Sequence, residues 1–170
     1  MLLGLALLYV GVVLYINGLW MMDRIEDREI VLVNLAAAFV TLVVALSSAL
    51  GFGADMAAVK SAALTLLFST TYLWVAVNRI IGADGRGLGW FSLLVAITVV
   101  PVAVQSLLAA HDLRSVWLGL NWAVWAVLWA MYFALLALHV PIRRATAWVT
   151  LLSGIFTGWL PGLLLLNGAL

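Results

Sequence analysis

Long uncharged stretches alternate along the chain with short segments that carry nearly all of the charge. The uncharged stretches cover residues 2–22, 30–54, 61–78, 88–110, 116–138 and 145–170. Each is close to the ~20 residues that a helix needs to cross the hydrocarbon core of a bilayer. The pattern therefore predicts an all-α membrane protein with six transmembrane helices, in which residues 1–170 form a single domain.

The connecting segments are too short to hold a soluble domain. They cover residues 23–29, 55–60, 79–87, 111–115 and 139–144, with between five and nine residues each. Short loops join the six helices as three hairpins, each of which begins and ends on the same side of the membrane. The first stretch has neither a basic region before it nor a small-residue cleavage site after it, so we expect it to remain in the protein as a helix.

Composition supports the same class of protein. Hydrophobic residues make up 67% of the chain and charged residues 9%, and the mean hydropathy is +1.23. These values lie far outside the range of water-soluble domains. The net charge of +1 says nothing about partners, and we expect no nucleic-acid partner. The absence of cysteine excludes disulfides and thiolate chemistry. We therefore expect a multi-pass protein whose immediate surroundings are membrane lipid.

The distribution of basic residues predicts the orientation. The first, third and fifth connecting segments contain Arg24, Arg28, Arg79, Arg86, Arg143 and Arg144, whereas the second and fourth contain only Lys60 and Arg114. Cytoplasmic loops of membrane proteins carry an excess of Lys and Arg. This rule places the odd-numbered loops in the cytoplasm and both termini outside.

The six stretches contain no ionisable group at their centres. Ion-coupled and proton-coupled transporters need such a group within the membrane. No metal cluster, cofactor motif or nucleophile with a neighbouring base can be assembled either, so we expect neither an enzyme nor a bound cofactor. Passive permeation of a neutral molecule is the function that needs no charge. The alternative is a membrane sensor or assembly subunit that transports nothing.

Three tryptophans stand out in the fifth stretch, at positions 122, 125 and 129. At 100° per residue they lie within an arc of roughly 60° and over about 10 Å of one helix. Phe68 and Tyr72, four residues apart in the third stretch, also share a face. Such aromatic faces either fill space between helices or form the walls of a path, and spacing does not distinguish the two.

The sixth stretch combines small residues with a proline. Gly154, Gly158 and Gly162 recur every four residues, a spacing that lets another helix approach closely. Pro161 has no backbone N–H and frees a carbonyl about one turn earlier, near Thr157. This carbonyl is available either for packing or for hydrogen bonding to a permeant.

Five strings, taken together, resemble the AmiS/UreI family of bacterial urea and short-chain amide channels. They are LGLALLYVGVVLYING from Leu3, LLFSTTYLWVAVN from Leu66, FSLLVAITVVPVAV from Phe91, WAVWAVLW from Trp122 and WVTLLSGIFTGWLPGLLL from Trp148. The resemblance implies a twisted bundle of six helices, assembled as a homo-hexamer with a pore in every protomer. The pore lining it implies consists of Leu3, Leu7, Val10, Leu14, Asn17, Phe68, Tyr72, Trp122, Trp125 and Trp129.

Two departures from the family pattern concern gating. Ser153 stands where an acid-gated urea channel of the family has a glutamate, so it is included among the candidate pore residues. The segments predicted to face outward are also short and contain only one histidine, His111. We therefore expect transport of urea or short-chain aliphatic amides that does not depend on acid activation.

Overall fold

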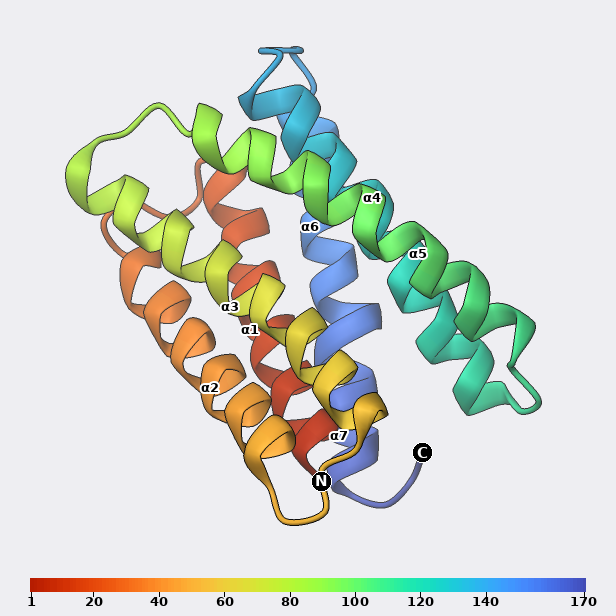
Figure 1. The fold of residues 1–170 in the computed structure, drawn as a ribbon. Coiled ribbons are helices and arrows are strands. Elements are labelled where there is room, and N and C mark those ends of the chain that lie inside the picture. The colour runs from red at the N-terminus through yellow and green to blue at the C-terminus, as the bar shows by residue number, and fades with distance from the viewer.

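The computed structural model describes all 170 residues and is helical throughout, with six helices long and apolar enough to cross a membrane (Figure 1). The first five are α1 (Leu2–Met21), α2 (Ile30–Leu50), α3 (Met56–Ile81), α4 (Arg86–Leu108) and α5 (Leu113–Leu136). The sixth span consists of α6 (Arg143–Ser153), a π-helical turn η1 (Gly154–Trp159) and α7 (Leu160–Leu166). The prediction of an all-α protein with six spans is confirmed.

Several helices begin or end away from the limits of the uncharged stretches. The second helix ends at Leu50 rather than 54, and the sixth span ends at Leu166 rather than 170. The third helix begins five residues before 61, because the Asp55 carboxylate accepts a hydrogen bond of 2.8 Å from the Ala58 N–H and caps it. It ends at Ile81 and is followed by Gly82, whose φ of 68° suits glycine. Charge therefore marks the membrane boundary rather than the helix end.

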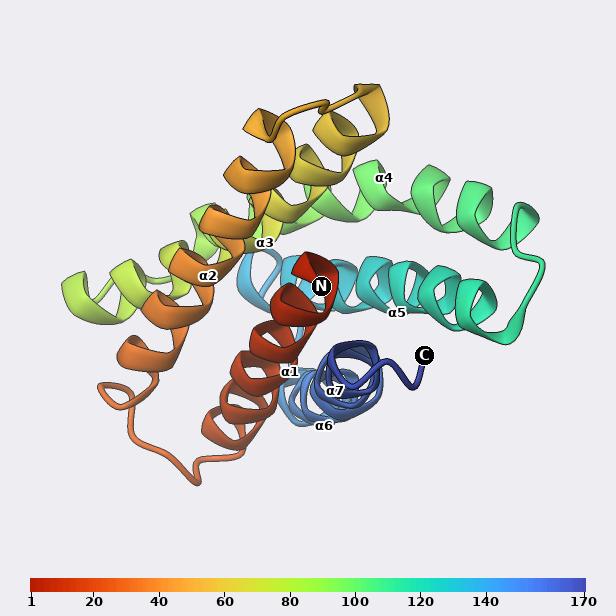
Figure 2. The ribbon, with the colours of Figure 1, turned by 90° about the horizontal axis from the view of Figure 1, so that it is seen from below.

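Consecutive helices run antiparallel, so both termini lie at one end of the bundle with the loops after α2 and α4 (Figure 1). The closest packing joins α2 to α3, α4 to α5, and α1 to the whole of the sixth span. Helices α3 and α4 diverge after their loop, as the view along the bundle shows (Figure 2). The three predicted hairpins are present in the chain order, and the tightest packing joins helices of different hairpins.

Helix α1 meets the sixth span at backbone contact distance. A Cβ atom on Gly158 would lie 2.4 Å from the Gly11 Cα, and one on Gly154 would lie 2.6 Å from the Tyr15 nitrogen. No side chain fits at either position. The close approach expected of the Gly154, Gly158 and Gly162 ridge is confirmed, and α1 is the helix that it contacts.

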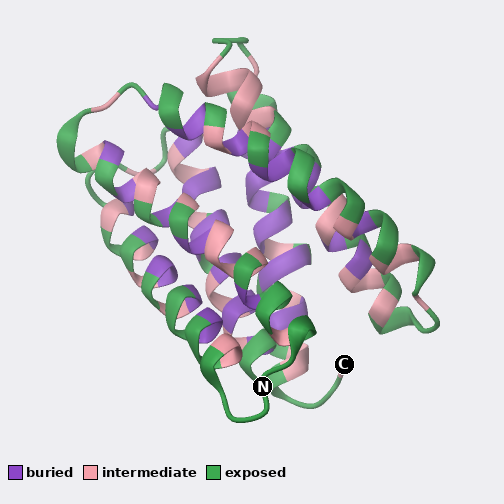
Figure 3. Ribbon diagram, viewed as in Figure 1, coloured by how far each residue is buried: buried purple, intermediate pink, exposed green.

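Buried residues lie on the faces that the helices turn toward one another (Figure 3). The outward faces are also apolar, with exposed side chains such as Phe39, Leu94, Ile97 and Val127. A water-soluble protein rarely exposes a continuous apolar surface of this kind. Lipid is the solvent that matches it.

Candidate permeation pathway

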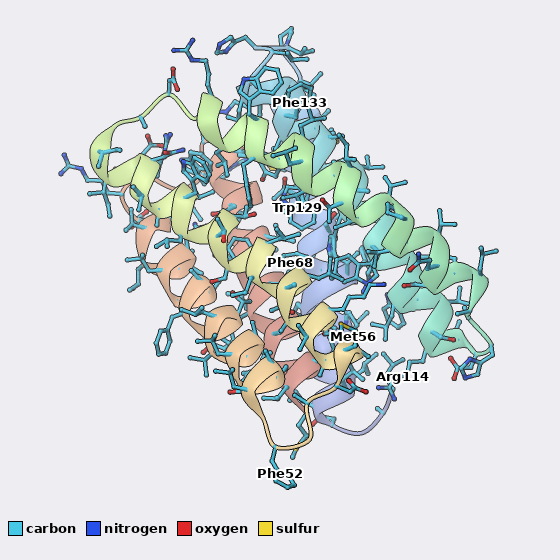
Figure 4. The ribbon with its side chains drawn as sticks, in the orientation of Figure 1. Phe52, Met56, Phe68, Arg114, Trp129 and Phe133 are labelled. Atoms are coloured by element: carbon cyan, nitrogen blue, oxygen red, sulfur yellow. The ribbon has the colours of Figure 1, made fainter.

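The centre of the bundle holds a cluster of aromatic rings gathered around Phe68. The Phe68 ring centroid lies 4.8 Å from that of Trp125 and 4.7 Å from that of Trp129, and the ring of Trp122 is 6.1 Å away. Tyr72, one turn further along α3, lies 6.3 Å from Phe68. Figure 4 shows Phe68 of α3 and Trp129 of α5 on facing sides of this centre. The two aromatic faces predicted from spacing therefore meet.

Two narrow cavities border this cluster. The first, here called the slot, is about 20 Å³ and is lined by Leu14, Phe68, Thr71, Tyr72, Trp125, Leu128, Trp129 and Tyr132. The second, the chamber, is about 30 Å³ and is lined by Leu14, Asn17, Thr71, Tyr72, Val75, Leu88, Ser92 and Tyr132. Each has room for about one water molecule. No charged side chain lines either of them.

A much larger cavity, the vestibule, opens at the end of the bundle that carries the odd-numbered loops. It has a volume of about 550 Å³. It shares Asn17, Val75, Leu88 and Tyr132 with the chamber, and the chamber shares Leu14, Thr71, Tyr72 and Tyr132 with the slot. The three cavities therefore lie in a row that leads from the vestibule to Phe68.

The charged groups of the vestibule are held in ion pairs at its rim. Arg79 lies 3.2 Å from Asp27, and Arg143 lies 2.7 Å from Asp23. The Trp20 indole donates a hydrogen bond to Asp27, which is the main cause that lowers the pKa of that carboxyl. Burial acts in the opposite direction, and the charge of Arg79 lowers the pKa further. These ion-paired side chains therefore keep the charge of the vestibule at its rim.

Two side chains of α5, four residues apart, anchor the π-helical turn. The Trp117 indole donates to the Phe156 carbonyl at 2.9 Å, and the Asn121 amide donates to the Thr157 carbonyl at 3.0 Å. These carbonyls lie five and four residues before Pro161, which has no N–H to offer them. The freed carbonyl predicted near Thr157 thus exists, but it binds α5 rather than facing the path.

Two aromatic side chains of the slot keep unused polar atoms. The Tyr72 hydroxyl and the Trp129 Nε1 make no hydrogen bond within the protein, although both residues are buried. Every fully enclosed side-chain nitrogen or oxygen atom has a partner, so these two atoms border open space. They are available to a molecule in the slot.

The predicted pore residues of α1 fall into two groups. Leu7, Val10, Leu14 and Asn17 are buried, but only Leu14 and Asn17 line the three cavities, while Leu7 and Val10 belong to the apolar core nearer the termini. Leu3 is 47% exposed at the start of the helix. The structure does not bring Leu3 to the aromatic cluster.

Trp122 and Ser153 also lie outside the row of cavities. Trp122 is partly buried and packs against Trp125, with ring centroids 5.1 Å apart. Ser153 is buried at the end of α6, where its carbonyl accepts a hydrogen bond of 2.6 Å from the Thr157 hydroxyl. The site where a glutamate was expected in acid-gated relatives is therefore beside the π-helical turn.

The sequence reasoning missed Tyr132, which lines all three cavities. Its hydroxyl is 3.0 Å from the Thr150 hydroxyl, which fixes the ring. Tyr132 follows Trp129 by three residues and therefore continues the stripe of positions 122, 125 and 129. Extending this helical spacing by one more step would have predicted Tyr132. The same extension from Tyr72 would have predicted Val75, three residues later.

The fold and the cavities define a multi-pass membrane protein with a narrow, uncharged path among its helices. Residues 2–169 match the AmiS/UreI family transporter model, and the chain belongs to that family. The resemblance found in the five strings is thereby confirmed. This is a family of channels and transporters, as expected for a chain without a catalytic site.

Relatives match nearly the whole chain. A putative amidate substrates transporter of Mycolicibacterium smegmatis is 38% identical over 166 residues, which cover 97% of this chain and 76% of that protein. The acid-activated urea channel of Helicobacter pylori is 34% identical over 188 aligned positions, with 96% of each chain covered. The cryo-EM structure of the H. pylori urea channel in a closed state superposes with a TM-score of 0.84, at 33% identity and 97% coverage of each chain.

Proposed function

We propose that this protein is a passive channel for short-chain aliphatic amides and urea, and that the permeant crosses through the vestibule, the chamber and the slot. The observation that carries the proposal is the row of three cavities joined by Tyr132, in which charge is confined to the entrance. The names of the relatives, an amidate transporter and a urea channel, support the same class of substrate.

The chemistry of the slot suits a flat, neutral solute. Its walls are aromatic faces, and the Tyr72 hydroxyl and Trp129 N–H supply uncharged hydrogen-bond partners. A neutral amide that leaves water loses hydrogen bonds of about 1–3 kcal/mol each, part of which such groups can restore. An ion would lose of the order of 20 kcal/mol of hydration on entering an apolar site. The slot therefore favours amides and excludes salts.

Phe68 forms the narrowest part of this path. Its ring lies against Trp125 and Trp129, and the slot beside it holds about one water molecule. A planar amide passes between these rings only if the Phe68 side chain moves aside. Passage is thus driven only by the concentration difference of the solute.

The setting in the cell follows from the charge distribution and the family. We propose that the vestibule faces the cytoplasm and both termini face outward in the bacterial inner membrane, an orientation that the excess of Arg near the vestibule supports. The proposed assembly is a homo-hexamer in which each protomer has its own path. The broad apolar outer surface supports contacts with both lipid and neighbouring protomers.

Acid activation is not part of this proposal. Ser153 is an uncharged residue, and its hydrogen bond with Thr157 involves only a backbone carbonyl and a hydroxyl. The loops at the end of the termini, around 51–55 and 109–112, are short, and the histidine near them, His111, is exposed beside Asp112. No carboxylate, histidine or basic side chain lines the chamber or the slot.

Stopped-flow light scattering of proteoliposomes tests the proposed path. Trp129→Ala, which removes one wall of the slot, should change acetamide and urea flux by about threefold or more, since buried aromatic truncations alter both size and contacts of a site. Trp148→Ala, an exposed tryptophan outside the path, is the matched control and should leave flux unchanged. Equal effects of both substitutions would overturn the assignment of the slot.

A further inference from the structure

The vestibule contains a buried amide side chain without a partner. Asn78, on α3, is 4% exposed, and its side chain makes no hydrogen bond within the protein. Because every fully enclosed side-chain nitrogen or oxygen atom is paired, both amide atoms of Asn78 border the open space of the vestibule. A buried amide left without a partner normally costs free energy, so it needs either water or a ligand.

A second amide lies at the junction of the vestibule and the chamber. Asn17 and Asn34 form a reciprocal pair, with N···O distances of 3.0 and 2.7 Å. Asn34 spends its second N–H on the Ile30 carbonyl at 2.8 Å, but Asn17 makes no further bond. Asn17 therefore retains one N–H and one acceptor position, and it lines both cavities.

The other side chains that line both the vestibule and the chamber are apolar or already paired. Val75 and Leu88 form the remaining wall where the vestibule narrows into the chamber, together with Tyr132, whose hydroxyl is taken by Thr150. The nearby carboxylates of Asp23, Asp27 and Asp84 are each paired with an arginine. Among the residues that the two cavities share, unused hydrogen-bonding capacity thus lies on Asn17, and Asn78 adds a second unpaired amide on the vestibule wall.

We infer that Asn78 and Asn17 form a binding site for a primary carboxamide group at the inner end of the vestibule. A primary amide has one acceptor and two donors at its edge, and a carboxamide side chain offers the complementary set, as the Asn17–Asn34 pair itself demonstrates. A permeant held here exchanges water for amide partners before it enters the apolar slot. The inference rests on the proposed channel function and assigns Asn78 a role in selecting the substrate.

The test is the concentration dependence of acetamide flux in proteoliposomes. Asn78→Leu keeps the size of the side chain but removes both polar atoms, and it should raise the half-saturating acetamide concentration about threefold or more, the effect of losing one or two hydrogen bonds. Asn167→Leu, the same substitution at an exposed position near the C-terminus, is the control. Asn78→Ala is a second variant, whose smaller side chain is accommodated more easily at this buried position.

The outcomes separate this inference from the function on which it rests. Wild-type flux of acetamide equal to that of empty liposomes would contradict the channel itself. Wild-type flux above that background, with unchanged half-saturation in both Asn78 variants, would overturn the binding site alone. A raised half-saturating concentration in either folded Asn78 variant, with the Asn167 variant unchanged, supports it.

Discussion

The indole Nε1 of Trp125 donates a hydrogen bond of 2.8 Å to the hydroxyl of Thr157, across the interface between α5 and the π-helical turn. The same hydroxyl donates at 2.6 Å to the Ser153 carbonyl, so both of its roles are occupied. The Trp125 ring lines the slot and packs edge-on against Phe68. Thr157, which does not touch the path, therefore fixes the position of one of its walls.

Thr157→Val tests this relationship. Valine has nearly the shape of threonine but cannot accept from Trp125, and a buried indole N–H left unpaired costs about 1–3 kcal/mol. We expect a lower melting temperature and reduced acetamide flux, because the released ring can turn into the slot. Thr157→Ser, which keeps the hydroxyl, should resemble wild type in both measurements. A valine variant with wild-type flux would show that the bond does not position the ring.

Phe68→Ala is expected to widen the path. Removing the ring at the centre of the aromatic cluster leaves a cavity and costs about 3–5 kcal/mol of stability. Bulkier amides such as butyramide should gain flux relative to acetamide in stopped-flow measurements. Phe52→Ala, at a fully exposed position in the loop after α2, is the control. It should change neither the stability nor the flux of butyramide relative to acetamide. Unaltered discrimination between the two amides in the Phe68 variant would argue against Phe68 as the constriction.

Gly158→Ala should disrupt the contact between α1 and the sixth span. The added Cβ would lie 2.4 Å from the Gly11 Cα, so the two backbones must move apart. We predict loss of most of the folded protein in size-exclusion chromatography, since overpacking at backbone contact distance costs about 1–3 kcal/mol or more. Val127→Ala, on the lipid-facing side of α5, should fold normally. Normal yield of the alanine variant at Gly158 would contradict the packing described.

Flux should be nearly independent of pH between 5 and 7.5. In the folded protein the pKa of Asp27 is lowered from 3.8. The stabilising ion pair of Asp27 with Arg79 is therefore fully present above pH 3.8, and it is lost only as the pH falls through the lower pKa of the folded state. The vestibule rim thus keeps its ion pairs over this interval. Urea flux at pH 5 and pH 7.5 should agree within about twofold. A rise of several-fold at pH 5 would contradict the absence of acid activation.

The sequence was sufficient to predict the spans and the aromatic faces. The hydropathy of a stretch depends only on its own residues. Helical spacing likewise brings Trp125 and Trp129 to one side of α5, regardless of which helix packs against that side. The identity of the facing helix is a tertiary property. That Phe68 of α3 inserts between these rings follows from how α3 crosses α5, which no local pattern contains.

Features that depend on pairing between distant residues were the least predictable. The freed carbonyl near Thr157 could be expected from Pro161, but its capture by Asn121 could not, since the two lie 36 positions apart. Asn78 resembles any polar residue at a helix end, and only the cavity around it shows that its amide is unpaired. Leu3, chosen for its place in the helical stripe, is exposed because α1 begins there.

The most direct test of the channel is the rate at which proteoliposomes containing the wild-type protein respond to a gradient of acetamide or urea. With no ion gradient or energy source present, we predict faster solute entry than in empty liposomes, and equally fast exit when the gradient is reversed. Rates that match those of empty liposomes for both solutes would contradict a passive path through the vestibule, chamber and slot.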